Sequence, residues 1–136
     1  MKKILIVKAP YYDKIVNQMY ERALDVLKYH DGKQRDKVKI KYETIEVSGA
    51  FEIPVSISKL IKKYDGFIAL GCVIKGETPH FDFISRAAID GIMKISIECK
   101  KPIGNGIITC LNMRQALARK KKGREAALAV ISVLSQ

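Results

Sequence analysis

Hydrophobic residues recur along the chain in two spacings that alternate from the first residues onward. Residues 3–7 form an apolar, β-branched run, which predicts a strand. The next segment predicts a helix because its apolar side chains recur every three or four positions. They are Ile15, Met19, Ala23 and Val26. A polar turn at residues 31–36 leads into residues 38–47, whose alternating pattern predicts a second strand with one buried face.

The same alternation continues through the rest of the chain. Ser48 and Gly49 end the second strand, and Pro54 lies near the start of a helix that we expect to reach about Lys63. Residues 66–74 are almost all apolar, as in a parallel strand that helices cover on both faces.

The last part of the chain predicts one more strand and three helices. A helix over residues 81–100 precedes a fourth strand at residues 103–110, and two closing helices are expected on either side of Gly123, at residues 111–122 and 125–134. Strands that alternate with helices imply right-handed crossovers and a parallel sheet between two helix layers. We therefore expect an α/β fold with a central four-stranded parallel sheet.

Length and composition are those of one folded domain. The 136 residues fall within the range of about 100–200 that a domain usually spans, and 48% are hydrophobic, so we expect a single domain over residues 1–136. The N-terminal apolar run ends too soon for a secretion signal. No segment approaches the roughly 18–20 uncharged apolar residues of a membrane helix, so we expect a cytoplasmic protein without membrane contact.

The chain has three cysteines, Cys72, Cys99 and Cys110, which are widely spaced. This spacing predicts reduced thiols, with neither disulfides nor a zinc site.

The charge balance is strongly basic. Twenty-five basic and fourteen acidic residues leave a net charge of +11, which suits either a polyanion or an anionic substrate. The excess is spread over the chain without an aromatic-interleaved basic stripe, which favours a solvated basic surface over a nucleic-acid site. The densest basic run, residues 114–124, indicates either a solvated helix face or an anion clamp. In a clamp, Arg119 would bind a phosphate through two parallel hydrogen bonds.

Candidate chemistry lies where the predicted strands end, because ligands of open α/β sheets bind beyond the carboxyl ends of the strands. After the third strand, Thr78 can cap a helix start and Pro79 suits its first turn, so backbone donors there form a seat for a phosphate. His80 follows, and histidine is the residue type whose ordinary pKa lies near neutral pH, as proton transfer requires, although a purely structural role is the alternative. His30 has no such surroundings and receives no role.

Two other loops offer small and aromatic side chains. Ala50 allows close backbone approach, and Phe51 and Glu52 add an aromatic face and a carboxylate, a combination that suits a planar, hydrogen-bonding heterocycle. Tyr11 and Tyr12 offer a stacking face from the first loop. Each of these residues is equally well explained as packing when taken alone.

Four sequence blocks match one family in their residues and in their order along the chain. They are VSGAFEIP at 47–54, ALGCVIKGETPHFDF at 69–83, NGIIT at 105–109 and QALAR at 115–119. Over nearly its whole length the sequence resembles lumazine synthases. The resemblance implies a three-layer αβα sandwich of the flavodoxin-like type. It also implies condensation, without cofactor or metal, of 5-amino-6-(D-ribitylamino)uracil with 3,4-dihydroxy-2-butanone 4-phosphate. The products are 6,7-dimethyl-8-ribityllumazine, phosphate and water, in the penultimate step of riboflavin biosynthesis.

The resemblance also implies a role for each matching residue. His80 would transfer protons, and Arg119 would bind the phosphate of the sugar. The remaining substrate-binding positions would be Tyr11 in the first loop, Ala50, Phe51 and Glu52 at the ribityl chain and uracil, Cys72, Val73 and Ile74 at the uracil edge, Glu77 and Thr78 at the phosphate-side turn, and Asn105 in the fourth strand.

The family resemblance also implies that several copies of the chain assemble. The family forms pentamers with sites between subunits, so Asn105 and Arg119 would serve a neighbour's pocket, and a functional link to riboflavin synthase is expected. The chain departs from the family at Pro10-Tyr11-Tyr12, where Arg-Phe-Asn is common, and at Ala87, where an acidic residue often stands. The brief segment 120–123 leaves open whether pentamers assemble further. Two rival hypotheses are a non-catalytic flavin or pteridine binder and a basic nucleic-acid-binding module.

Overall fold

A computed structural model describes residues 1–29 and 39–136. His30 and the predicted polar turn at 31–36 lie outside the described residues. Four parallel strands form one sheet in the order β2-β1-β3-β4. The elements are β1 (Lys2–Lys8), α1 (Asp13–Tyr29), β2 (Ile40–Glu46), the 3-10 helix η1 (Ala50–Glu52), α2 (Ile53–Lys59), β3 (Gly66–Ile74), α3 (His80–Cys99), β4 (Ile103–Cys110), α4 (Met113–Leu117) and α5 (Lys122–Leu134).

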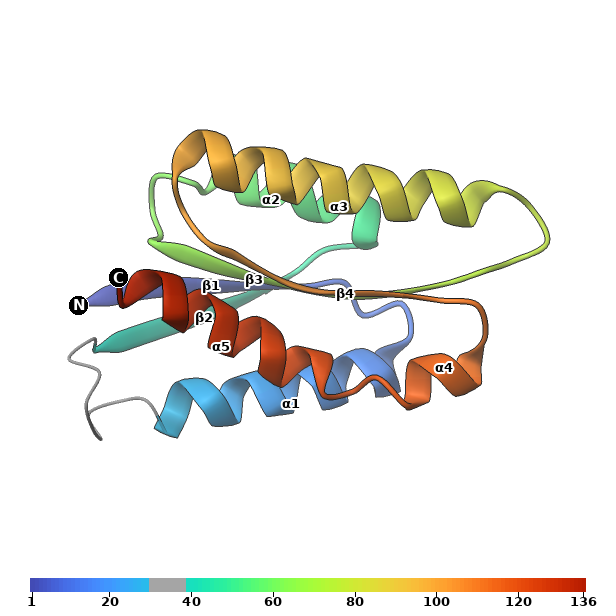
Figure 1. The fold of residues 1–136 in the computed structure, drawn as a ribbon, viewed down its shortest axis with the longest axis horizontal. Helices are drawn as coiled ribbons and strands as arrows, with labels where there is room; N and C mark the ends of the chain where they lie inside the picture. Colours follow the sequence, from blue (N-terminus) through green and yellow to red (C-terminus); the bar gives the residue numbers. More distant parts are fainter. Residues whose placement is uncertain (30–38) are drawn as a thin grey trace.

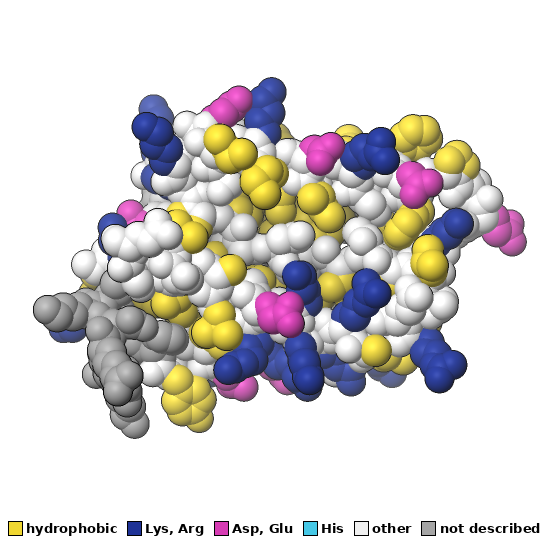
Figure 2. Space-filling view, in the orientation of Figure 1, with side chains coloured by type: hydrophobic (Ala, Val, Ile, Leu, Met, Phe, Trp, Pro, Cys, Tyr) yellow, Lys and Arg dark blue, Asp and Glu magenta, His cyan; other side chains and the backbone are white. Residues whose placement is uncertain are grey.

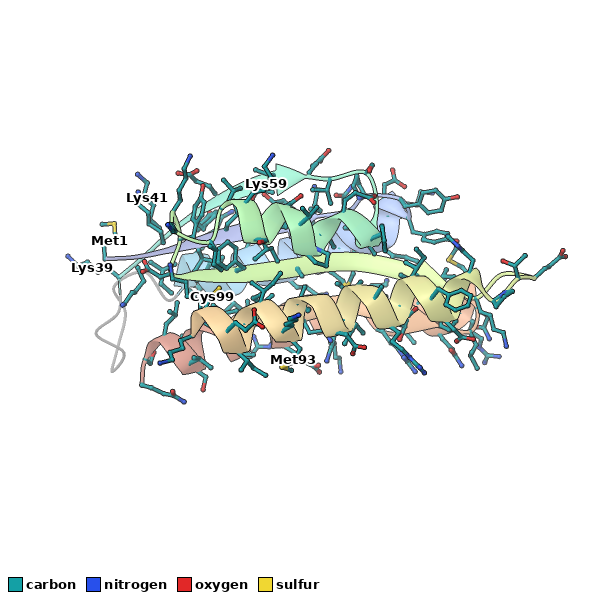
Figure 3. The ribbon with its side chains drawn as sticks, turned by 90° about the horizontal axis from the view of Figure 1, so that it is seen from above. Met1, Lys39, Lys41, Lys59, Met93 and Cys99 are labelled. Carbon is teal, nitrogen blue, oxygen red and sulfur yellow. The ribbon has the colours of Figure 1, made fainter. Side chains whose placement is uncertain are left out.

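Helices cover both faces of this sheet. Helices α2 and α3 lie on one face, and α1, α4 and α5 lie on the other (Figure 1). Seen from above, α2 and α3 run side by side over the strands (Figure 3). Side chains of β1 point alternately to the two faces of the sheet. Ile4 and Ile6 pack in the core beneath α1 and α5. Leu5 and Val7 pack in the core beneath α2 and α3. The predicted three-layer α/β fold with a four-stranded parallel sheet is confirmed.

The break between the last two helices lies at residues 118–121 and not at Gly123, as predicted. The expected helix over 111–122 is only the short α4, and Gly123 lies inside α5. Gly123 is buried where α5 meets α1, and a Cβ there would stand 2.6 Å from the Met19 carbonyl carbon and 2.7 Å from the Met19 Cα. A glycine is therefore needed for the close approach of the two helix backbones, and it does not end a helix here.

Helix α2 is also shorter than predicted, since it ends at Lys59 and not near Lys63. Beyond its end, Leu60 N–H donates to the Ile57 carbonyl and Lys63 N–H donates to the Leu60 carbonyl, so the chain continues in tighter turns. Lys101 Nζ binds the carbonyl oxygens of Ile61 and Tyr64 at 2.6 and 2.9 Å and satisfies acceptors that follow the helix. This partner comes from a distant segment, so the local pattern does not reveal it.

The topology brings the loops after the strands to one edge of the sheet, because all four strands run parallel. The chain moves from β1 outward to β2 and then returns to β3 on the other side of β1. Such a reversal opens a crevice at the carboxyl ends of the two central strands, where ligands bind in open α/β folds. Within the described residues, no helix is both long and apolar enough to cross a lipid bilayer.

Candidate active site

A pocket of about 590 Å³ lies at this reversal point, between the loops after β1, β2 and β3 and the start of α3. We call it the aromatic pocket. It is lined by Tyr11, Tyr12, Gly49, Ala50, Phe51, Glu52, Cys72, Val73, Ile74, Gly76, Thr78, His80, Phe81 and Ile84.

Most of the predicted site residues meet in the aromatic pocket. Glu77 is the exception on this side of the molecule, because it is exposed and does not line the pocket. Phe81 and Ile84 line it although they were not predicted. Ile84 lies one helical turn after His80, so the four-residue spacing from the histidine was the signal that would have indicated it.

Exposed aromatic rings form the mouth of this pocket. Tyr11 is 78% exposed, and its ring meets that of Tyr12 edge to face, with 5.0 Å between the centroids. Phe51, in η1, is 57% exposed. Burial, and next the neighbouring Tyr11, raise the pKa of Tyr12, so its hydroxyl is neutral at physiological pH. Large rings left open to water at a pocket mouth offer a stacking surface to a flat ligand.

The end of β3 forms the floor of the pocket. Cys72 is buried there, and burial raises the pKa of its thiol to about 12, with a smaller contribution from Cys110. A thiol with such a pKa stays protonated at neutral pH and is a poor nucleophile. Cys72 therefore contributes shape and apolar surface to the pocket and not covalent chemistry.

His80 is the first residue of α3 and is exposed at the pocket. Pro79, and not Thr78 as predicted, occupies the capping position of α3, and it makes no side-chain capping bond. Thr78 Oγ1 instead lies 3.4 Å from the His80 backbone nitrogen, a long hydrogen bond. The imidazole itself lines the aromatic pocket, where it can reach a bound ligand.

A second pocket, of about 470 Å³, lies along β4, the edge strand, between α3 and α5. We call it the basic pocket. It is lined by Ile89, Asn105, Ile107, Ile108, Thr109, Ala118, Arg119, Lys121, Lys122 and Glu125. Figure 2 shows lysine and arginine side chains gathered over the start of α5.

Arg119 and Asn105 are the two predicted site residues in the basic pocket. Arg119 is exposed, and its Nη1 donates to the Thr109 carbonyl oxygen at 3.5 Å. Burial raises the pKa of the neighbouring Cys110 thiol, and the positive charge of Arg119 beside it offsets part of that rise. Asn105 Oδ1 accepts from the Ile107 amide at 3.0 Å and so covers part of the open edge of β4. Lys121 and Lys122 line the same pocket, whereas Lys120 does not.

The two pockets share no lining residue in a single chain. His80 and the aromatic rings belong to the aromatic pocket, and Arg119 belongs to the basic pocket. The aromatic pocket brings exposed rings, a carboxylate and an imidazole together. The basic pocket has the charge for a phosphate.

Comparison with known proteins agrees with this chemistry. A family model described as 6,7-dimethyl-8-ribityllumazine synthase matches residues 1–136. A protein of that name from Nitratidesulfovibrio vulgaris is 40% identical over 139 residues, covering 97% of this chain and 86% of its own. One from Sulfurimonas denitrificans is 39% identical over 140 residues, covering 98% and 88%. One from Bartonella bacilliformis is 37% identical over 142 residues, covering 96% and 88%. The chain therefore belongs to the 6,7-dimethyl-8-ribityllumazine synthase family.

Proposed function

We propose that the chain catalyses the condensation of 5-amino-6-(D-ribitylamino)uracil with 3,4-dihydroxy-2-butanone 4-phosphate. The products are 6,7-dimethyl-8-ribityllumazine, inorganic phosphate and water. The observation that carries this proposal is the aromatic pocket itself, where exposed rings, a carboxylate and a histidine meet in a chain of this family.

The aromatic pocket provides for the heterocyclic substrate. Tyr11 and Phe51 offer ring faces to the uracil, and Glu52 offers a carboxylate to the hydroxyl groups of the ribityl chain. The amine attacks the ketone to form an imine, phosphate is eliminated, and the ring closes with loss of a second water. Each of these steps moves a proton, and His80 brings an imidazole, the side chain most often used for general acid–base catalysis, into the pocket. We assign proton transfer to His80.

The basic pocket provides for the sugar phosphate. Arg119 can bind a phosphate through two parallel hydrogen bonds, and Lys121 and Lys122 add positive charge beside it. Phosphate is also the leaving group of the reaction, so the same cations stabilise the charge that develops as it departs.

A single chain keeps the two substrates apart, which supports assembly into an oligomer whose sites lie between subunits. Helix α3 has an exposed apolar surface, since Phe83 is 70% and Ile97 is 67% exposed and only Ala88 and Ile92 of its twenty residues are fully buried. Met93 lies on the side of α3 that faces away from α2 (Figure 3). We propose a homopentamer, as in the family that the sequence resembles, in which the Arg119 of one chain faces the aromatic pocket of the next.

The catalytic assignments are tested by steady-state kinetics. Lumazine absorbance and phosphate release are followed together, with the uncatalysed condensation as the baseline. Removal of the proton shuttle in His80→Ala lowers kcat by about 10²–10⁴-fold, and activity remains because holding two substrates together accounts for most of the acceleration. Arg119→Ala raises KM for the sugar phosphate. No turnover above the spontaneous rate in the wild-type protein refutes the function, and an unchanged rate in His80→Ala refutes the role of that residue.

Mixing the two impaired variants, at a sugar-phosphate concentration below the KM of Arg119→Ala, tests the shared site. His80→Ala and Arg119→Ala are unfolded together, refolded together and assayed. If each site takes His80 from one chain and Arg119 from its neighbour, random mixing restores about one site in four. If both residues act within one chain, the mixture has only the activity of the separate variants. Native mass spectrometry gives the number of subunits.

Two further expectations come from the family resemblance. The protein is proposed to act in the cytoplasm, and its product makes riboflavin synthase a functional partner. Co-purification of the two enzymes from cells tests whether that link is physical.

A further inference from the structure

Ser48 lies in the loop between β2 and η1, at the edge of the aromatic pocket. Its hydroxyl donates to Oε1 of Glu52 at 2.9 Å. Ser48 does not itself line the pocket. Its hydrogen-bond partner Glu52, however, is one of the lining residues.

The backbone of Glu52 is held independently of this contact. Its amide donates to the Gly49 carbonyl at 3.1 Å, and its carbonyl accepts from Ser56 Oγ at 2.9 Å. Glu52 also caps α2 in a helical conformation, with φ −86° and ψ −6°. The remaining freedom of the residue is therefore in its side-chain torsions, which the Ser48 bond restricts.

Gly49 gives the carboxylate room to lie in this position. The backbone at Gly49 is extended, and a Cβ there would stand 3.2 Å from Glu52 Oε1. The carboxylate is thus folded back against its own loop, with Oε1 taken by Ser48. Among residues 1–29 and 39–136, no side chain bonds to Oε2, so this oxygen can accept from a ligand.

We propose that Ser48 is a positioning residue, which holds the Glu52 carboxylate ready to accept hydrogen bonds from the polyol chain of the heterocyclic substrate. The inference rests on the proposed function. A glutamate side chain loses rotamer freedom when a ligand immobilises it, and a side chain that is already ordered in the free protein loses less on binding. Ser48 therefore strengthens binding of the hydroxyl-bearing ligand without touching it.

The test compares two ligands and four variants, which are Ser48→Ala, Ser48→Thr, Glu52→Gln and the double variant of Ser48→Ala with Glu52→Gln. Dissociation constants are measured by fluorescence titration for 6,7-dimethyl-8-ribityllumazine, which carries the polyol chain, and for 6,7-dimethyllumazine, which lacks it. Ser48→Ala weakens binding of the first ligand by about 3- to 10-fold, the usual range for one hydrogen bond, and leaves binding of the second within twofold. Ser48→Thr retains a hydroxyl and restores the affinity. Ser48→Ala added to Glu52→Gln has a smaller effect than Ser48→Ala alone, because both changes act through one contact.

Steady-state kinetics test the positioning role of Ser48 independently of the binding measurements. Ser48→Ala raises KM for the ribitylaminouracil, whereas KM for the sugar phosphate and kcat stay within twofold of wild type. An equal loss of affinity for both ligands, full additivity with Glu52→Gln, or failure of Ser48→Thr to restore binding overturns the inference. If the wild-type protein neither binds the ribityllumazine nor turns over, the proposed function has failed. If it does both and Ser48→Ala is indistinguishable from it, only the role of Ser48 has failed.

Discussion

Gly104 in β4 offers a quantitative test of how α5 is seated on the sheet. A Cβ at this position would stand 2.9 Å from the Ala126 carbonyl carbon and 2.9 Å from Val130 Cγ2, and would overlap the Ala126 carbonyl oxygen. Ordinary carbon contacts begin near 3.4 Å. In Gly104→Ala, α5 must therefore move away from β4 by about 0.5 Å or more, a gap that forfeits a quarter to a half of the dispersion energy of each contact affected.

The cost of this displacement follows from what α5 buries. Its inner face consists of Ala126, Ala127, Val130 and Ile131, which all belong to the core beneath α1 and α5. Overpacking of a close-packed core costs about 1–3 kcal/mol of unfolding free energy. For a chain of this size we expect the melting temperature to fall by about 4–12 °C.

Thermal unfolding followed by circular dichroism, at one fixed protein concentration, measures this change. Gly76→Ala is the matched control, because a Cβ at Gly76 meets no atom within 4 Å. It should be neutral or stabilise by up to about 1 kcal/mol, since alanine reduces the conformational freedom of the unfolded chain. If Gly104→Ala melts with the wild type or with Gly76→Ala, the close backbone contact between α5 and β4 is not what seats the helix.

Two further predictions concern Lys101 and the cysteines. Lys101→Met retains the aliphatic stem but leaves the carbonyl oxygens of Ile61 and Tyr64 without their cationic donor. Urea unfolding should therefore show that the free energy of unfolding falls by about 1.5–3 kcal/mol. Lys63→Met, at an exposed lysine, is the control and should change it very little. Cys99 is exposed, whereas burial raises the pKa of both Cys72 and Cys110. At pH 8 a thiol reagent should therefore modify Cys99 in the folded protein and the other two only after denaturation, and equal rates for all three would contradict the burial described above.

Local pattern was sufficient for the elements that dominate the sheet. The apolar run 66–74 corresponds to β3, and residues 103–110 correspond to β4. Residues Ile15, Met19, Ala23 and Val26, chosen for their spacing alone, are all buried on α1. These predictions hold because burial on one or both faces imposes a period on the sequence that does not depend on which partner covers the face.

The ends of elements were predicted less well. Gly123 was expected to separate two helices, and it is instead the point where α5 meets the backbone of Met19. Helix α2 stops early and is followed by acceptors that Lys101 satisfies. In both cases the determining contact comes from a residue far away in the chain, which no local window contains.

The candidate site likewise has features that the sequence predicts and features that only the tertiary structure decides. The parallel direction of the strands, the loops at their carboxyl ends and most of the residues that gather there follow from the sequence, because parallel topology sends those loops to one edge of the sheet. Only the tertiary structure separates the predicted residues into two pockets, with His80 in one and Arg119 in the other. The physical reason is that pocket membership depends on which side of β3 and β4 the helices α3 and α5 cover, and that is settled by packing between segments distant in sequence.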